Sequence, residues 1–517
     1  MYQIYPRSFM DSNADGVGDL AGIIDRLGHL EWLGVDAIWL NPTMPSPNRD
    51  WGYDVSDYMG VHPDLGTPDE LDRLVAEAGR RGMRVLLDLV PNHTSDRHPW
   101  FLDSRSSVEA EHRDWYVWAE GRDGRPPNNW LSVFGGDLAW EHDPSSGQWY
   151  LHNFLAEQPD LNWWNDDVRD AFDEIIRYWF DRGVAGFRVD VAHALVNDRE
   201  LRDNPPTTRH DHPHYQRVGQ LPIYNMNRPE THDVLRRWRR LADDYADPER
   251  VFVGETYVLD VERLAAFYGD GSDQLHMAFN FPFALADLDA PKLADIVRRT
   301  EELLPEGAWP AWTASNHDVG RLATRWAGDD ERKARCALML LLGLRGTPFL
   351  YQGDEIALGH VDVPYERLKD PVGLRYWPDE AGRDPCRTPM QWEAAEGAGF
   401  TAPGVEPWLP VGDSTERNVE QQRSDPASVL HLCRDLIALR RSSADLRSAP
   451  YSEAVVDGPV WRWRRGQTLV VLNLGDGPAR LEDVTGTVSI STTREHDGRA
   501  VRGGLDLAPW GGVLLES

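Results

Sequence analysis

Apolar residues along the chain follow two alternating patterns, one typical of amphipathic helices and one typical of buried strands. Short apolar runs at residues 35–40 and 84–90 are typical of strands that are covered on both faces. The stretch between these strands and the N-terminus has the helical spacing of three and four residues, at Leu20, Ile23, Ile24, Leu27, Leu30 and Leu33. The sequence therefore begins with a strand–helix–strand unit.

The same alternation continues to about residue 352 and predicts about eight units of a strand followed by a helix. The predicted strands are residues 3–6, 35–40, 84–90, 184–191, 251–255, 276–281, 309–315 and 344–352. Predicted helices between them are residues 20–33, 69–81, 166–181, 230–244 and 331–342. Because repeated alternation predicts a parallel sheet and eight units predict a closed one, we expect an α/β protein built on a (β/α)8 TIM barrel.

Two segments interrupt this rhythm. Residues 94–165 follow the third strand and are rich in Trp, Asn, Gly and Pro, and a structureless loop of that length is uncommon. From about residue 443 the pattern changes to short alternating strands, which predicts a C-terminal antiparallel β-sandwich. The expected domains are a barrel of residues 1–93 and 166–442 with a long loop region at 352–425, an inserted domain at 94–165, and the β-sandwich at 443–517.

Composition narrows the possible partners. The net charge of −31 argues against nucleic acid and anionic membranes. No apolar run reaches 18 residues, so no transmembrane helix is expected. The 22 tryptophans are more informative. Flat apolar rings with one polar group suit the faces of sugars, although most of these tryptophans must belong to the core.

The cysteines and the N-terminal residues bear on the compartment. Cys336, Cys386 and Cys433 are few, odd in number and widely spaced, which predicts a reducing compartment without a disulfide framework. Residues 1–6 read as the start of a strand and lack the charged head and apolar run of a signal peptide. We therefore expect a cytoplasmic protein, while no pattern predicts its oligomeric state.

Residues 186–193 form a short strand that carries Arg188, Asp190 and His193 at its C-terminal end. Side chains alternate along a strand, so Arg188 and Asp190 emerge on the same face. A guanidinium next to a carboxylate lowers the pKa of that carboxylate, and an ionised carboxylate can act as a nucleophile. Taken alone, this pair fits equally well a structural ion pair under a loop.

Three other predicted strands also end in carboxylates and histidines. The residues at these ends are Asp88 and His93, Glu255, and His317 and Asp318. Active sites of such barrels lie at the C-terminal ends of the strands, whereas structural ion pairs would occur at both ends. This grouping of negative charge suits glycoside hydrolysis, in which one carboxylate attacks the anomeric carbon and another protonates the leaving oxygen.

The order of these motifs resembles the α-amylase superfamily of glycoside hydrolases, family 13, and specifically its α-glucosidase and oligo-1,6-glucosidase branch. The resemblance covers nearly the whole chain. Four segments are similar to the family signatures in the right order, namely residues 88–95, 186–193, 253–256 and 315–318. Residues 158–162 resemble an additional signature at the end of the inserted domain.

The resemblance implies roles for six of these residues. Asp190 would be the nucleophile, Glu255 the general acid/base and Asp318 the transition-state stabiliser. Arg188, His93 and His317 would bind the sugar whose bond is cut. The implied mechanism is retaining, through a covalent glucosyl–enzyme ester, and it needs a proton on Glu255 near neutral pH.

Further positions resemble those that close the sugar pocket in that branch. The equivalents of Asp50 and Arg387 close the pocket beyond the non-reducing sugar, and the equivalent of Tyr53 stacks under it. A closed pocket admits only a chain end, so the resemblance implies exo action that releases single glucose units. For Asp50 and Arg387 the alternative is a salt bridge that fixes two loops. Phe154 and Gln158 match further sugar-contacting positions.

Val191, directly after the expected nucleophile, bears on linkage preference. In the resembling branch this position tends to be Val in enzymes that prefer α-1,6 linkages and Thr or Ala in those that prefer α-1,4 linkages. Val191 therefore favours α-1,6 linkages, although one apolar residue shifts specificity by only about 1–3 kcal/mol. Action on α-1,4 linkages and on sucrose stays open, as do transglycosylating or isomerising relatives such as sucrose isomerases, trehalose synthases and sucrose hydrolases.

Residues 11–19 place oxygen-bearing side chains at alternate positions around a Gly turn, as calcium-binding loops do. The pattern departs from an EF-hand because the twelfth position is Gly22. In the resembling branch this loop binds one structural Ca²⁺ or Mg²⁺, which implies as ligands Asp11, Asn13, Asp15, the backbone carbonyl of Val17, and Asp19. The alternative is an acidic surface turn without an ion, and no organic cofactor is expected.

A non-enzymatic interpretation also exists, because relatives of this family serve as subunits of amino-acid transporters. Such subunits have a membrane-spanning segment and have lost catalytic residues. This sequence has no such segment and retains the residues, so we expect an enzyme that acts on a small oligosaccharide or glucoside.

Overall fold

Eight parallel strands form the centre of the computed structural model, which describes residues 1–134 and 136–516. Their order is β10-β11-β1-β2-β3-β7-β8-β9, and a parallel bridge between Phe279 and Ala311 closes the remaining gap. The strands are β1 (Tyr2–Ile4), β2 (Ala37–Leu40), β3 (Arg84–Leu89), β7 (Gly186–Val189), β8 (Val251–Gly254), β9 (Met277–Ala278), β10 (Ala311–Thr313) and β11 (Thr347–Tyr351). The predicted barrel is confirmed.

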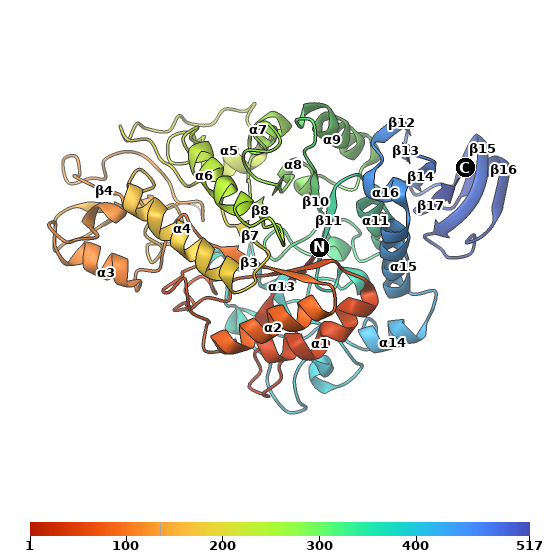
Figure 1. Ribbon diagram of the computed structural model, residues 1–517, viewed down its shortest axis with the longest axis horizontal. Coiled ribbons are helices and arrows are strands. Elements are labelled where there is room, and N and C mark those ends of the chain that lie inside the picture. Colours follow the sequence, from red (N-terminus) through yellow and green to blue (C-terminus); the bar gives the residue numbers. More distant parts are fainter. Residues whose placement is uncertain (135, 517) are drawn as a thin grey trace.

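Helices surround these strands (Figure 1). The five predicted helices are present as α1 (Leu20–Leu33), α2 (Pro68–Arg80), α4 (Asp166–Asp181), α6 (Thr231–Asp243) and α11 (Glu331–Gly343). The sequence analysis did not identify α9 (Ala290–Leu303) and α15 (Val429–Ser442), nor the shorter α5 (Pro213–Val218), α7 (Val261–Ala266), α8 (Phe281–Leu285), α10 (Leu322–Arg325) and α16 (Ala444–Ser448). Local signals set several of the boundaries, and α2 begins with a capping box between Thr67 and Glu70.

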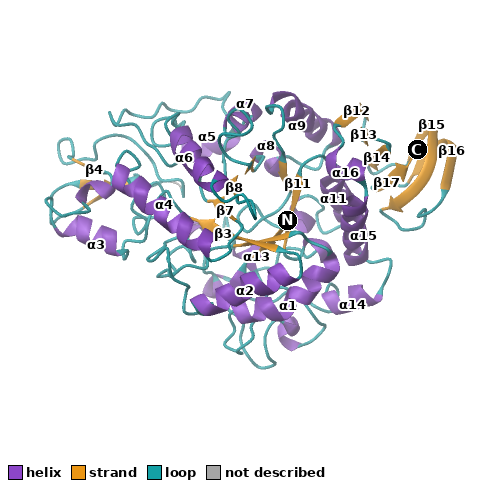
Figure 2. Cartoon of the chain, in the orientation of Figure 1, coloured by secondary structure: helices purple, strands orange, loops and turns teal. Residues whose placement is uncertain are grey.

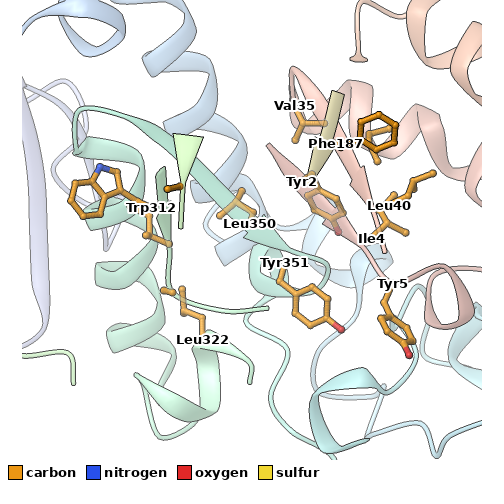
Figure 3. Packing of buried hydrophobic residues seen from close by; sticks show 14 of the residues in the cluster. Tyr2, Ile4, Tyr5, Val35, Leu40, Phe187, Trp312, Leu322, Leu350 and Tyr351 are labelled. Carbon is orange, nitrogen blue, oxygen red and sulfur yellow. The ribbon is translucent and has the colours of Figure 1, made fainter. Parts of the chain in front are cut away.

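The barrel has two apolar layers. Inside it, a small cluster includes Trp39, Val253 and Phe349. Between the strands and the helices lies a much larger cluster, part of which Figure 3 shows, with Tyr2 from β1 and Leu350 from β11. Because strand side chains alternate, one face of each strand fills the interior and the other packs on the helices. This packing holds the C-terminal strand ends at fixed positions.

The inserted segment follows the third barrel strand, as predicted, and projects from one end of the molecule (Figure 1). It contains α3 (Pro99–Ser106) and an antiparallel sheet of β4 (Trp118–Ala119), β5 (Trp140–His142) and β6 (Trp149–Leu151). A separate apolar cluster, which includes Trp130, Trp140 and Leu151, lies under this sheet. The insertion therefore has a small core of its own.

At the opposite end, six antiparallel strands form the C-terminal sheet, orange in Figure 2. They are β12 (Tyr451–Asp457), β13 (Val460–Arg465), β14 (Thr468–Asn473), β15 (Ala479–Ser491), β16 (Ala500–Leu507) and β17 (Gly511–Glu516). Trp463 is fully buried, and its indole nitrogen donates to the Gly343 carbonyl at 3.3 Å, at the end of α11. The predicted antiparallel β domain is thus present and packs on the barrel helices.

The long segment after β11 is mostly irregular, as expected, but it also contains α12 (Pro371–Tyr376), α13 (Asp384–Arg387) and α14 (Val419–Ser424). It returns to the C-terminal face of the barrel, where Met390 donates its backbone N–H to the Ser8 carbonyl at 2.8 Å. Among the residues that the structure describes, no helix is long and apolar enough to span a membrane.

Candidate active site

Arg188 joins three carboxylates at the C-terminal ends of neighbouring strands. Its Nη1 atom lies 2.7 Å from Asp88 Oδ1 and 2.6 Å from Asp190 Oδ1, and its Nη2 atom lies 2.8 Å from Glu255 Oε2. The parallel register explains this arrangement, because Asp88 and Val253 are the neighbours of Arg188 on β3 and β8. Since Asp190 and Glu255 contact the two terminal nitrogens of one guanidinium, their carboxyl groups are close neighbours.

Three carboxyl groups share this single guanidinium in a buried place. Burial raises the pKa of Asp190 well above its ordinary value, although Arg188 opposes the shift. Burial likewise raises the pKa of Asp88 to about 6. Arg188 does lower the pKa of Asp190, as expected, but the net shift is upward because desolvation outweighs the attraction of one shared positive charge. Burial and the neighbouring carboxyl groups thus act together against full ionisation of the Asp88 and Asp190 carboxyls.

Asp318, by contrast, is held ionised. Burial alone would raise its pKa, but His317, Arg387 and Arg383 together lower it below the ordinary range of a carboxyl group. Arg387 Nη2 lies 2.8 Å from Asp318 Oδ1, and Arg383 Nη1 lies 3.3 Å from the same atom. Burial lowers the pKa of His317 well below its ordinary value, although the neighbouring Asp318 opposes that shift.

The arginine that pairs with Asp50 is Arg383. Its Nη2 atom lies 2.7 Å from Asp50 Oδ1. Arg387, one helical turn further along α13, is fully buried and donates from Nε to the His317 carbonyl at 2.9 Å. The expectation that Asp50 and Arg387 act together is therefore corrected. Arg383 lines the pocket beside Asp50, and Arg387 supports Asp318 from behind.

Tyr53 lies flat against His317, with ring centroids 5.5 Å apart and an interplanar angle of 8°. Its hydroxyl donates to Asp88 Oδ2 at 3.0 Å. The tyrosine is thus fixed at both its ring and its hydroxyl, and it forms part of the pocket wall. Its expected role beneath a bound sugar stays a prediction.

His93, Gln158 and Phe154 form a second group around Asp50. Gln158 Nε2 lies 3.2 Å from Asp50 Oδ2 and 3.0 Å from His93 Nε2. The ring of Phe154 lies 5.1 Å from that of His93. Burial lowers the pKa of His93 to about 4, so the imidazole is neutral at neutral pH and can accept or donate hydrogen bonds without carrying charge.

Val191 has an unusual backbone conformation directly after Asp190. Its φ angle is +35°, which a β-branched residue rarely adopts. In this conformation its N–H donates to Glu255 Oε2 at 2.9 Å, and its side chain packs with Met226 and Phe154. Val191 therefore links the two expected catalytic carboxyls through its backbone and faces the pocket with its side chain.

These side chains surround a pocket of about 220 Å³. The predicted residues that line it are Asp50, Tyr53, His93, Phe154, Asp190, Val191, Glu255 and Asp318. Four other predicted residues stand behind this lining: Gln158, Arg188, His317 and Arg387. The structure thus brings together every residue that the sequence analysis assigned to the sugar site.

The sequence analysis missed the outer wall of the pocket. That wall comes from the inserted domain (Leu131, Val133, Phe134), from residues 204–227 (Asn204, His214, Tyr215, Val218, Gln220, Pro222, Asn225, Met226, Asn227), and from Tyr257 and Arg383. Tyr257 follows Glu255 by two residues, so the alternation that located Arg188 and Asp190 was a usable signal for it. Residues 204–227 carry no motif, and only the fold brings them to the site.

The loop of residues 11–19 lies apart from these carboxylates and is tied by its own side chains. Asp11 Oδ2 accepts from the Gly16 N–H at 2.8 Å, and Asp19 Oδ1 accepts from the Gly22 N–H at 2.6 Å, which caps α1. Within residues 1–134 and 136–516, no three His, Cys, Asp or Glu side chains converge as metal ligands. The all-oxygen donor set suits Ca²⁺ or Mg²⁺ in kind, and Asn13 and Asp15 are exposed.

Comparison with known proteins places these features in a family. The α-amylase catalytic-domain family matches residues 3–449. A probable α-glucosidase from Rhizobium meliloti (strain 1021) is 43% identical, over 99% of this chain and 95% of its own length. An oligo-1,6-glucosidase from Heyndrickxia coagulans is 37% identical, over 89% of this chain and 87% of its own length.

Solved structures resemble the whole chain. The α-glucosyl transfer enzyme XgtA is 40% identical, with a TM-score of 0.91 over 100% of this chain and 98% of that one. Trehalulose synthase MutB from Pseudomonas mesoacidophila MX-45 is 32% identical, with a TM-score of 0.90 over the same shares. A mutant of MutB has been solved in complex with sucrose.

Proposed function

The chain belongs to the α-amylase family of glycoside hydrolases, family 13, as a hydrolase of the α-glucosidase type, and we propose that it is an exo-acting, retaining α-glucosidase. Its substrates would be short α-glucosides with α-1,4 or α-1,6 linkages, from which it releases glucose at the non-reducing end. The observation that carries this proposal is the shared guanidinium of Arg188, which sets Asp190 beside Glu255 at the bottom of a pocket.

The proposed reaction has two displacements. Asp190 Oδ attacks the anomeric carbon while Glu255 donates its proton to the leaving glycosidic oxygen, which yields a covalent glucosyl ester and a free alcohol. Glu255, now ionised, takes a proton from a water molecule, and the water oxygen attacks the anomeric carbon and releases Asp190. Asp318 stays ionised beside two arginines and can accept hydrogen bonds from sugar hydroxyls throughout. Two inversions retain the α configuration.

We infer exo action from the contacts of Asp50, which lines the pocket. Asp50 lies 2.7 Å from Arg383 and 3.2 Å from Gln158. These contacts would close the pocket beyond a glucose ring at a chain end, so that a glucan chain continuing in that direction would not fit. The linkage preference rests on Val191, which favours α-1,6 linkages, and the similarity to an oligo-1,6-glucosidase agrees with that preference.

The test is a substrate panel with product identification. Maltose, isomaltose, sucrose, trehalose and maltotriose are incubated with the enzyme, and products are followed by NMR from the first turnovers. We expect the glucose from the non-reducing end to form first as the α anomer. Each bond cleaved should yield two glucose molecules from maltose, isomaltose or trehalose, and one from sucrose or maltotriose. Initial release of the non-reducing-end glucose as the β anomer, or no cleavage of any of the five sugars, contradicts the proposal.

A second candidate is glucosyl transfer or isomerisation at the same site. The observation that favours it is the similarity over the full chain to XgtA, described as an α-glucosyl transfer enzyme, and to a trehalulose synthase. In that case the glucosyl ester on Asp190 would be attacked by a sugar hydroxyl in place of water. The same panel separates the two candidates, because transfer yields new disaccharides or longer products without stoichiometric free glucose.

We also propose that the loop of residues 11–19 binds one structural Ca²⁺ or Mg²⁺. Asp11, Asn13, Asp15, Asp19 and the Val17 carbonyl would supply oxygen ligands. A bound ion would offset the repulsion of the three acidic side chains and fix the start of α1, which Asp19 caps. It takes no part in the chemistry, which Asp190, Glu255 and Asp318 carry out elsewhere.

A further inference from the structure

Trp377 and Tyr365 are the only Phe, Tyr or Trp side chains with large exposure in the part of the chain that the structure describes. Trp377 is 41% exposed and Tyr365 is 48% exposed. Their ring centroids lie 6.1 Å apart with an interplanar angle of 45°, so they form one continuous aromatic surface. Leu374, 46% exposed in α12, lies on the same segment. The chain has 22 tryptophans. In the part that the structure describes, the largest exposed aromatic area lies at this one place, where Trp377 is beside Tyr365.

The segment that carries Trp377 is tied to the lining of the sugar pocket. Tyr376, next to Trp377, donates its hydroxyl to the backbone carbonyl of Phe134, which lines the pocket on the side of the inserted domain. Glu380, three residues on, pairs with Arg217 at 2.6 Å, in the helix whose Tyr215 lines the other side. Trp377 therefore sits on the strip of chain that bridges the two outer walls.

The same strip leads into the pocket itself. Arg383, six residues after Trp377, lines the pocket and contacts Asp318 and Asp50. Its guanidinium lies over the ring of Phe134 at 5.2 Å. The aromatic pair is thus continuous with the sugar site through a segment that is anchored at three points.

We propose that Trp377 and Tyr365 form a second saccharide-binding surface, which holds the part of an oligosaccharide that extends out of the pocket mouth. This proposal rests on the proposed function, because it takes the chain leaving the pocket to be a glucoside. The occupant is an uncharged α-linked glucose chain of about three or more units. Its rings have an apolar CH face that packs on flat aromatic rings and a hydroxyl edge that hydrogen-bonds to polar neighbours.

The surroundings supply such polar neighbours. Glu366 and Asp379 are exposed and stand next to Tyr365 and close to Trp377 in the sequence. Carboxylates accept hydrogen bonds from sugar hydroxyls, and they bring no positive charge that would select an anionic ligand. Apolar rings flanked by acceptors match a neutral polyhydroxyl chain.

The first test compares a disaccharide with the tetrasaccharide of the same linkage, whichever of the maltose or isomaltose series the enzyme cleaves. For Trp377→Ala we expect kcat/KM on the tetrasaccharide to fall about fivefold, the factor given by a loss of about 1 kcal/mol, with little change on the disaccharide. Trp377→Phe, which keeps a ring, should retain most of the tetrasaccharide activity. Leu303→Ala, a truncation of an exposed apolar side chain elsewhere (39% exposed), is the matched control.

The second test does not depend on catalysis. In native gels that contain soluble starch or dextran, the wild type should be retarded relative to a gel without glucan, and Trp377→Ala should be retarded less. Equal losses on the disaccharide and the tetrasaccharide together with unchanged retardation would show a packing role and overturn the proposal. Concentration-dependent dimerisation that Trp377→Ala abolishes would also overturn it, because the occupant would then be a second copy of the chain. A failure of the proposed function shows separately, as wild-type enzyme that cleaves neither disaccharide.

Discussion

At the scale of single residues, the site is governed by the ratio of charges. One guanidinium, that of Arg188, serves Asp88, Asp190 and Glu255, whereas two guanidinium groups serve Asp318. Burial therefore raises the pKa of Asp190 in the first group, whereas the pKa of Asp318 stays low. A glycosidase needs this asymmetry, because one carboxyl must give a proton while another stays charged against the forming oxocarbenium ion.

Asp190→Asn tests the assignment of the nucleophile. We expect kcat to fall by about 10⁴-fold or more, as it does when a covalent nucleophile is removed. Folding should be preserved, because the variant removes a carboxyl whose charged form burial disfavours. Turnover is measured on the best substrate of the panel, with circular dichroism and thermal unfolding as controls. Near wild-type turnover in a freshly prepared, sequence-verified sample would refute the assignment.

Val191→Thr tests the residue proposed to bias linkage. Both side chains are β-branched, so the strained backbone at φ +35° and the N–H contact to Glu255 are matched in the two proteins. Only a methyl group is exchanged for a hydroxyl at the pocket wall. We expect the ratio of α-1,4 to α-1,6 activity to rise by about 5- to 150-fold, the range that corresponds to about 1–3 kcal/mol. An unchanged ratio of kcat/KM for maltose and isomaltose removes Val191 from the explanation of specificity.

At the scale of elements, function lies in the few residues that follow each strand. β7 ends at Val189 and β8 at Gly254, and the next residues are Asp190 and Glu255. The chain after β11 makes a comparable contribution through α13, where one helical turn separates Arg383 in the pocket from Arg387 behind it. Short irregular segments between rigid elements thus position the charges, while the strands fix where those segments begin.

The loop of residues 11–19 yields a prediction at this scale. After treatment with a chelator, added Ca²⁺ should raise the unfolding temperature, and saturation at about 100 times Kd corresponds to about 2.7 kcal/mol. Asp15→Ala should lose this response, because it removes one of the proposed ligands. Asp362→Ala, which removes an exposed carboxylate elsewhere, is the control and should keep it. Equal responses of the two variants in differential scanning fluorimetry exclude the loop as the metal site.

At the scale of the whole molecule, three parts of the chain that are distant in sequence meet at one pocket. The inserted domain supplies Phe134 and Phe154, the barrel supplies the carboxylates, and the segment after β11 supplies Arg383. The C-terminal sheet lies at the far end and contacts the barrel through Trp463 and Gly343, not through the pocket. We infer that this sheet contributes stability, and the pocket depends on the other three parts.

Buried histidines make global stability depend on pH. Burial lowers the pKa of His276 from 6.5 to about 3. Below about pH 6.5 the unfolded chain therefore binds a proton that the folded chain does not, so the stability present above pH 6.5 is lost progressively as the pH falls towards 3. His276→Gln should lose less stability than the wild type between pH 7.5 and pH 5, by up to about 2 kcal/mol. Urea titrations at both pH values measure this, with the exposed His142→Gln as the control. A wild-type slope in His276→Gln contradicts the prediction.

The sequence by itself determined the barrel, because hydrophobic periodicity and helix caps are local properties. It also located Arg188, Asp190, Glu255 and Asp318, since strand alternation and the rule of strand ends turn a linear position into a spatial one. Helix α9 escaped the analysis although it has local signals, an Asp289 cap and a proline in its first turn. Sequence patterns that extend over only a few residues are therefore enough to predict the barrel strands and the catalytic residues at their C-terminal ends.

Only the tertiary structure decided which arginine faces Asp50, how the charges balance and what forms the outer wall. Arg383 and Arg387 are four residues apart and equally plausible in sequence, but packing buries Arg387 completely. The direction of the Asp190 pKa shift depends on desolvation, which is a property of the closed pocket and not of its neighbours in the chain. Residues of the segment 204–227 reach the pocket, and Trp377 packs beside Tyr365, through contacts between distant parts of the chain that no local pattern records.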